Sequence, residues 1–132
     1  MSYRILVVED SVSTRSLIVS TLEAIENLVV VESESGFDAL KMIPQGKFDL
    51  IITDINMPNI NGLELVSFVK KNPRYESIPL IIVTTEGGEK DRERGISLGA
   101  EEYLAKPFDP EDLQRLVAKY LKLEAKRETA AI

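Results

Sequence analysis

Residues 5–10 of the chain read ILVVED, a run of four apolar residues that ends in two acids. The run is continuous rather than alternating and is rich in β-branched side chains. Such runs are typical of strands in a parallel sheet that is covered by helices on both faces. Similar short runs recur at Leu28–Val31, Leu50–Thr53, Leu80–Val83 and, more weakly, Glu102–Ala105. The sequence therefore predicts five strands.

The segments between these runs have apolar residues at intervals of three and four, which indicates amphipathic helices. Two examples are the set Leu17, Ile18, Leu22 and Ile25 and the set Leu113, Leu116, Val117, Tyr120 and Leu121. Strands and helices alternate without a linker or a repeat. The pattern predicts a single α/β domain of five βα units, in which right-handed crossovers make a doubly wound parallel sheet.

Several helix ends are marked by capping residues. Asn61 followed by Glu64 is typical of a capping box, and Asp109-Pro110 is typical of an N-cap with proline in the first turn. Gly99 is expected to end the fourth helix. The second helix is expected over about Phe37–Ile43, with Pro44 as its stop.

The composition excludes several classes of function. A chain of 132 residues has room for one ordinary domain, and it contains no Cys and no His, which excludes disulfides, thiolate sites and histidine chemistry. The net charge of −6 disfavours nucleic acid as a partner. No apolar stretch is long enough for a membrane span and the first residues, MSYRILVVED, do not have a signal-peptide pattern, so we expect a cytoplasmic protein.

Chemically reactive side chains follow four of the five predicted strands. They are Glu9 and Asp10 after the first, Asp54 after the third, Thr84 and Thr85 at the end of the fourth, and Lys106-Pro107 after the fifth. Strand ends in such a sheet share one edge, where ligands bind. Clustered carboxylates without His or Cys favour a hard cation such as Mg²⁺, and a lysine and a hydroxyl nearby suit phosphoryl transfer. Taken singly, each residue also fits a plain role as a helix cap, a turn former or a solvated lysine.

The motifs ILVVEDS, DLIITDINMPNINGLEL, PLIIVTTE and GAEEYLAKPF closely resemble those of the response-regulator receiver domain, particularly the single-domain chemotaxis CheY type. The resemblance covers Arg4 to about Leu121 and implies a flavodoxin-like three-layer sandwich with sheet order 2-1-3-4-5. We therefore expect a receiver domain over residues 1–121, followed by a helix extension or flexible tail over 122–132.

The resemblance implies a role for each residue at the predicted edge. Asp54 would accept a phosphoryl group from a phosphohistidine on a partner histidine kinase. Glu9, Asp10, Asp54 and the backbone carbonyl of Asn56 would bind Mg²⁺, although the family more often has Asp at the position of Glu9. Lys106, before a typically cis Pro107, would contact the phosphoryl oxygens.

The same resemblance implies a switch and an output. Thr84 would be the switch hydroxyl and Tyr103 the switch aromatic, and together they would change the surface of the fourth helix, fifth strand and fifth helix for an unknown protein target. Asn56 and Glu86 resemble the pair found in fast-cycling chemotaxis regulators. Thr85 replaces the usual Ala or Gly and would slow access to the site, so the phosphoryl lifetime is left open. Gly62 is expected to allow a backbone conformation that a Cβ would oppose.

The resemblance implies a signalling domain that is not an enzyme, except that it would catalyse its own phosphorylation and dephosphorylation. Three alternatives to this interpretation remain. A pseudo-receiver would keep the fold as an interaction module without phosphorylation. A Mg²⁺-dependent phosphohydrolase of the haloacid-dehalogenase type would need an acid two residues after Asp54, where this chain has Asn56. A flavodoxin-like FMN carrier would need a neutral phosphate loop where this chain has Glu9 and Asp10.

Overall fold

The computed structural model describes residues 2–57, 60–84 and 89–122, and strands alternate with helices through all three ranges. The strands are β1 (Tyr3–Val8), β2 (Leu28–Ser33), β3 (Leu50–Thr53), β4 (Leu80–Thr84) and β5 (Glu102–Ala105). The helices are α1 (Val12–Leu22), α2 (Gly36–Gly46), α3 (Gly62–Lys71), α4 (Glu89–Ser97) and α5 (Pro110–Leu121).

The five strands form one parallel sheet in the order β2-β1-β3-β4-β5, which confirms the predicted doubly wound, flavodoxin-like topology. Val8 at the end of β1 pairs with both Ser33 of β2 and Thr53 of β3. Thr84 at the end of β4 pairs with Ala105 at the end of β5. The carboxyl ends of the strands therefore lie along one edge of the sheet, as the sequence predicts.

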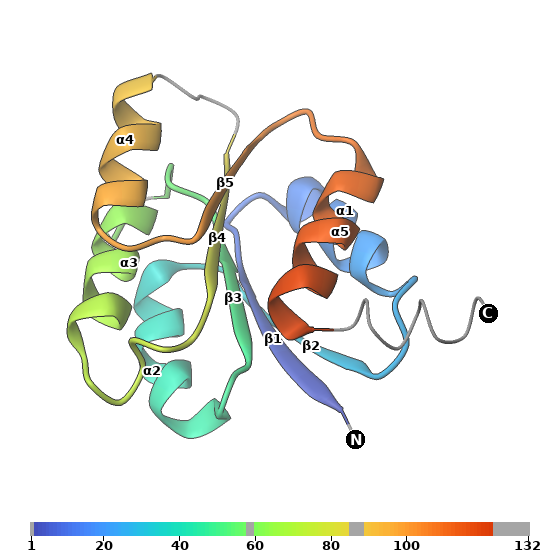
Figure 1. Cartoon of the computed structure of the whole chain (residues 1–132), viewed down its shortest axis with the longest axis horizontal. Coiled ribbons are helices and arrows are strands. Elements are labelled where there is room, and N and C mark those ends of the chain that lie inside the picture. Colours follow the sequence, from blue (N-terminus) through green and yellow to red (C-terminus); the bar gives the residue numbers. More distant parts are fainter. Residues whose placement is uncertain (1, 58–59, 85–88, 123–132) are drawn as a thin grey trace.

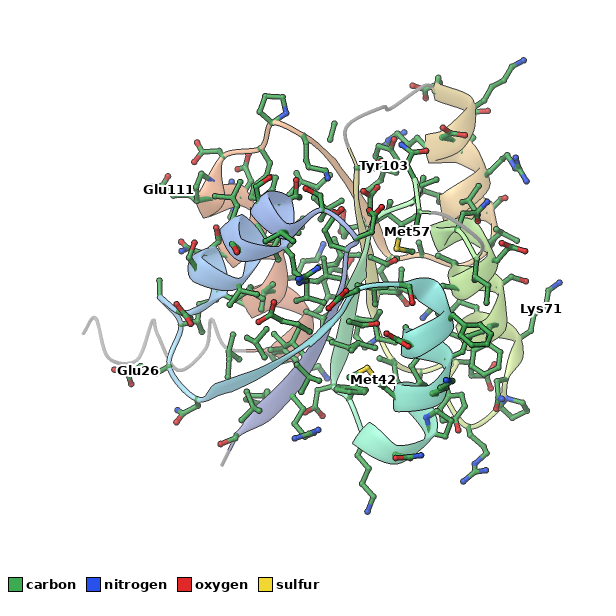
Figure 2. All side chains as sticks on the ribbon, turned by 180° about the vertical axis from the view of Figure 1, so that it is seen from behind. Glu26, Met42, Met57, Lys71, Tyr103 and Glu111 are labelled. Carbon is green, nitrogen blue, oxygen red and sulfur yellow. The ribbon has the colours of Figure 1, made fainter. Side chains whose placement is uncertain are left out.

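Helices cover both faces of the sheet (Figure 1). Helices α2, α3 and α4 lie on one face, and α1 and α5 lie on the other. Charged side chains such as those of Glu26, Lys71 and Glu111 project from the outer surface (Figure 2). In the described part of the chain, no helix is long and apolar enough to cross a membrane.

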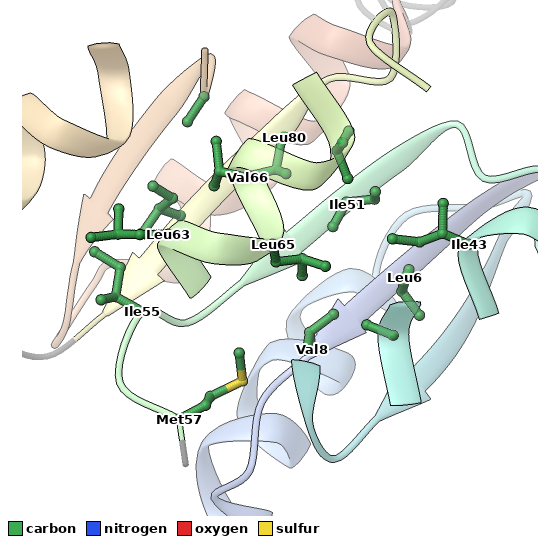
Figure 3. Packing of buried hydrophobic residues seen from close by; sticks show 14 of the residues in the cluster. Leu6, Val8, Ile43, Ile51, Ile55, Met57, Leu63, Leu65, Val66 and Leu80 are labelled. Atoms are coloured by element: carbon green, nitrogen blue, oxygen red, sulfur yellow. The ribbon is translucent and has the colours of Figure 1, made fainter. Parts of the chain in front are cut away.

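Each face of the sheet has its own hydrophobic core. Leu6, Val8 and Ile51 pack against α2 and α3 in one cluster (Figure 3), while Ile5 and Val7 face the other cluster with α1 and α5. Consecutive strand residues point to opposite faces, so a strand covered on both sides needs apolar residues at every position. The residues 5–8 are at most 1% exposed, which confirms this interpretation of the ILVV run.

The predicted capping residues are present at their helices. Asn61 and Glu64 form a reciprocal capping box, with N···O distances of 2.9 and 3.0 Å. Asp109 is the N-cap of α5 with Pro110 in its first turn, and Gly99 has a φ of 118° after α4.

Two details of the helix predictions are wrong. Helix α2 begins at Gly36 and continues through Pro44 to Gly46, rather than stopping at Pro44. The proline lies in the last turn with its ring exposed, where the missing N–H removes a single helical hydrogen bond and the buried Ile43 keeps the turn packed. Leu17 is 47% exposed rather than part of the buried face of α1.

Candidate functional site

Three carboxylates meet at the carboxyl edge of the sheet. Glu9 and Asp10 directly follow β1, and Asp54 directly follows its neighbour β3. One carboxylate oxygen from each residue lies within 4.8 Å of the others. Glu9 is 1% and Asp54 6% exposed, whereas Asp10 faces solvent. The parallel pairing of β1 with β3 brings together acids that are more than forty positions apart in the sequence.

Lys106 supplies a positive charge to this cluster. Its Nζ lies 3.1 Å from Glu9 Oε1 and 3.4 Å from Asp54 Oδ2, and its side chain is 9% exposed. The Lys106 N–H donates to the carbonyl of Thr84 at 2.8 Å, which holds the start of the β5–α5 loop against β4. The Lys106–Pro107 peptide bond is cis. One ammonium therefore bridges the carboxylates that follow β1 and β3.

The cluster has more negative than positive charge. Burial raises the pKa of the Glu9 carboxyl to about 7, and the nearby Asp54 adds to the rise. The Ser11 N–H and the Lys106 ammonium act in the opposite direction, because both stabilise the ionised form. Three carboxylates and one ammonium leave an excess of negative charge. A site of oxygen donors alone fits a hard cation such as Mg²⁺.

Asn56 connects Asp54 with Thr84. The backbone N–H of Asn56 donates to Asp54 Oδ1 at 3.1 Å, and its side-chain Nδ2 donates to Thr84 Oγ1 at 3.3 Å. Thr84 is fully buried at the end of β4, while Asn56 is exposed. The carboxylate of Asp54 and the hydroxyl of Thr84 therefore lie on either side of a single amide residue.

Tyr103 occupies the middle of β5, opposite Ile82 of β4, and is half-buried against the core of the α2–α3–α4 face. With Ile96 and Arg92 of α4 it lines a cavity of about 370 Å³ between α4 and β5. Thr85 and Glu86 lie outside the described residues. The structure thus brings Glu9, Asp10, Asp54, Asn56, Thr84 and Lys106 together and places Tyr103 on the adjacent strand.

Two residues of the site have roles that the sequence did not reveal. Arg15 donates from Nη1 to the carbonyl oxygen of Glu9 at 2.7 Å, and the signal for it was its position as the lone charge in VSTRSLIVSTL. Gly62 is required by close approach and not by an unusual backbone angle, because a Cβ there would lie 2.0 Å from the Asp54 carbonyl oxygen.

Comparisons with known families and proteins agree with this geometry. The response regulator receiver domain family matches residues 5–118. A chemotaxis protein CheY homolog of Campylobacter jejuni is 39% identical over 112 residues, which cover 84% of this chain and 86% of that protein. A probable transcriptional regulator, ycf29, of Pyropia yezoensis is 36% identical over 98% of this chain, and the match spans 58% of its own length.

A solved structure with the same fold holds a metal ion at its active site. The receiver domain of the sensor histidine kinase PA1611 from Pseudomonas aeruginosa has a magnesium ion coordinated in its active site cleft. It superimposes with a TM-score of 0.83 at 25% identity and covers 92% of this chain and 99% of that one.

Proposed function

The chain belongs to the response regulator receiver domain family, and from this we propose that it accepts a phosphoryl group on Asp54 from a phosphohistidine of a partner kinase. The phosphorylated form would then signal to a protein target. The proposal includes a cytoplasmic location and a functional unit over residues 1–121, with 122–132 as an extension.

One observation carries the proposal. The carboxylates of Glu9, Asp10 and Asp54 lie within 4.8 Å of one another, and the Lys106 ammonium lies 3.4 Å from Asp54. A plain helix cap or a solvated lysine does not explain why groups from three loops are gathered in one largely buried cluster. A receiver requires this arrangement, because phosphoryl transfer depends mainly on positioning and charge neutralisation.

The proposed transfer uses the side chains as they lie. A carboxylate oxygen of Asp54 forms a bond to phosphorus, the P–N bond to the donor imidazole breaks, and its electron pair stays on the imidazole nitrogen. Lys106 would neutralise charge on the phosphoryl oxygens. Mg²⁺, held by Glu9, Asp10, Asp54 and the Asn56 carbonyl, would neutralise further charge when bound.

The proposed switch begins at Thr84. The Thr84 hydroxyl oxygen accepts from the Asn56 amide, so its O–H would be able to donate to a phosphoryl oxygen on Asp54, and movement of Thr84 toward that oxygen would let Tyr103 move inward. Tyr103 borders the cavity beside α4, and Gly95 is the buried residue of that helix. An α4 with so little buried apolar surface can shift at low cost, which would alter the α4–β5–α5 surface that a target binds.

The test is phosphorylation by a small donor. The chain is incubated with MgCl₂ and acetyl phosphate and its intact mass is measured, with Asp54→Ala as the variant and Asp38→Ala, an exposed acid of α2, as the matched control. We expect one added phosphoryl group on the wild type and on Asp38→Ala, and none on Asp54→Ala. No adduct on the wild type would favour a pseudo-receiver, and an adduct that persists on Asp54→Ala would refute the assignment.

The switch needs a separate readout. The chain has four Tyr and no Trp, so amide and Tyr103 ring shifts are followed by NMR with and without beryllofluoride, a phosphoryl mimic. We expect shifts at Thr84, Tyr103 and α4. Shifts confined to the loops around Asp54 would refute the proposed output surface.

A further inference from the structure

Arg15 connects three elements near the acidic cluster. Its side chain is 12% exposed and its Nε pairs with Glu32 Oε1 of β2 at 2.9 Å. Its Nη1 donates to the carbonyl oxygen of Glu9 at 2.7 Å. A single guanidinium therefore holds α1, the edge strand β2 and the first residue after β1 in a fixed relation.

The backbone carbonyl of Glu9 lies just beyond the point where the regular pairing of β1 with β2 stops. The β1–β2 ladder ends at the pair Val8–Ser33, and the Glu9 N–H still donates to the Ser33 carbonyl at 3.0 Å. The carbonyl oxygen of Glu9, in contrast, accepts its hydrogen bond from the Arg15 side chain. The peptide group between Glu9 and Asp10 is thus fixed by a side chain where the strand no longer fixes it.

We propose that Arg15, oriented by Glu32, is a positioning residue of the cation site, which holds the Glu9–Asp10 peptide so that both carboxylates face Asp54. Asp10 is exposed, so the direction of its backbone decides where its carboxylate lies. This inference rests on the proposed Mg²⁺-dependent function.

The charge and the geometry of Arg15 are expected to have opposite effects on Mg²⁺ affinity. A guanidinium next to the site repels a cation, so electrostatics alone predicts that removing it strengthens Mg²⁺ binding. Loss of positioning predicts the opposite, because groups that orient metal ligands typically contribute tenfold or more to affinity. The sign of the change therefore separates the two roles.

The ion pair with Glu32 serves orientation more than stability. Glu32 is 49% exposed, and half-exposed pairs of this kind contribute little to folding. The planar guanidinium can donate in two directions from one fixed plane, which a lysine ammonium on a flexible stem does not reproduce. Arg15→Lys therefore keeps the charge and removes the fixed geometry.

The experiment measures Mg²⁺ affinity by calorimetry and amide NMR shifts at pH 8 without any phosphodonor. We expect Arg15→Met and Arg15→Lys to bind Mg²⁺ about tenfold more weakly than the wild type. Arg115→Met removes a 67% exposed arginine of α5 and is the matched control, with unchanged affinity. Unchanged or tighter binding by Arg15→Met would overturn the proposal.

Two further variants distinguish a lost positioning role from a general loss of folding. Ile18→Val loosens the buried side of α1 without touching the Glu9 carbonyl, and we expect its affinity to equal that of the wild type. An equal loss in Ile18→Val would assign Arg15 a merely structural role. Glu32→Gln tests the orientation if Arg15→Met does not fold, and we expect an affinity loss smaller than the tenfold loss of the Arg15 variants, because Glu32 acts only through Arg15. No loss in Glu32→Gln would then count against the proposal.

The wild type separates this inference from the function on which it rests. A wild-type chain that binds no Mg²⁺ would refute the proposed function and the positioning role together. A wild-type chain that binds Mg²⁺, with Arg15 variants that bind it equally well, would refute the positioning role alone.

Discussion

Replacing Glu9 by glutamine is expected to stabilise the metal-free protein at pH 8. Burial raises the pKa of Glu9 from 4.5 to about 7, so the folded protein keeps this proton at pH values where the unfolded chain has lost it. The wild type therefore loses stability as the pH rises from 4.5 to about 7. Ionising the folded Glu9 costs about 3 kcal/mol more than ionising the unfolded one, at about 1.4 kcal/mol per pKa unit.

The glutamine side chain does not ionise and so removes this cost, but its NH₂ group takes the place of one carboxylate oxygen that accepts a hydrogen bond. Glu9 accepts from Ser11 N at 3.1 Å through one oxygen and from Lys106 through the other, and a glutamine can offer oxygen to only one of them. Losing one such bond costs about 1 kcal/mol. The expected net gain for Glu9→Gln is thus about 2 kcal/mol at pH 8, falling to near zero at pH 5, where unfolded Glu9 is itself partly protonated.

The assay is urea unfolding followed by circular dichroism in EDTA at pH 5 and pH 8. Glu26→Gln, an exposed glutamate between α1 and β2, is the matched control and should show no such pH-dependent gain (Figure 2). In MgCl₂ at about 100 times its Kd the wild type should gain about 2.7 kcal/mol, and Glu9→Gln should gain less. A variant no more stable than the wild type at pH 8, or a difference equal at both pH values, would refute the reasoning.

Three other predictions concern the same site and its supports. Mg²⁺ affinity of the wild type should fall below pH 7 by up to about tenfold per pH unit, because a proton on Glu9 competes with the cation, and calorimetry between pH 8 and pH 6 checks this. Gly62→Ala should destabilise the fold by about 3 kcal/mol in urea, since its Cβ meets the backbone of Asp54, and an effect below about 1 kcal/mol would contradict the contact. Lys70→Met should cost about 2 kcal/mol, because it removes the donor that Glu101 and the backbone carbonyls of Glu76 and Ile78 share, whereas Lys71→Met, which alters an exposed side chain, should cost little.

The strands were predictable because each one is covered on both faces. The side chains of the runs ILVV, LIIT and LIIV pack into both hydrophobic cores, and a strand that is buried on both faces is the structure that such continuous apolar runs favour. Helix α2 was predicted too short because Pro44 acts locally against a helix, while the tertiary packing of Ile43 keeps the last turn in place. Local signals were sufficient where they agreed with packing and misleading where they did not.

The acids and the lysine of the site were predictable as residues at strand ends, because each follows its own apolar run. The family resemblance further implied that these acids would share a cation site, but the individual contacts in and around that site were not predictable. Arg15 contacts the Glu9 carbonyl through a distance set by the packing of α1 on the sheet. The elevated pKa of Glu9 follows from burial that a linear pattern does not contain.

The sequence by itself determined the α/β class, the parallel strands and the set of side chains at their carboxyl ends, because hydrophobic periodicity is a local property and strands that alternate with helices form parallel sheets. Only the tertiary structure decided that Lys106 pairs with Glu9 as well as with Asp54, that Asn56 reaches Thr84, and that Gly62 is needed for close approach. These contacts depend on strand order and side-chain burial. Both are fixed when distant segments pack together, so neither can be predicted from any one segment of the chain.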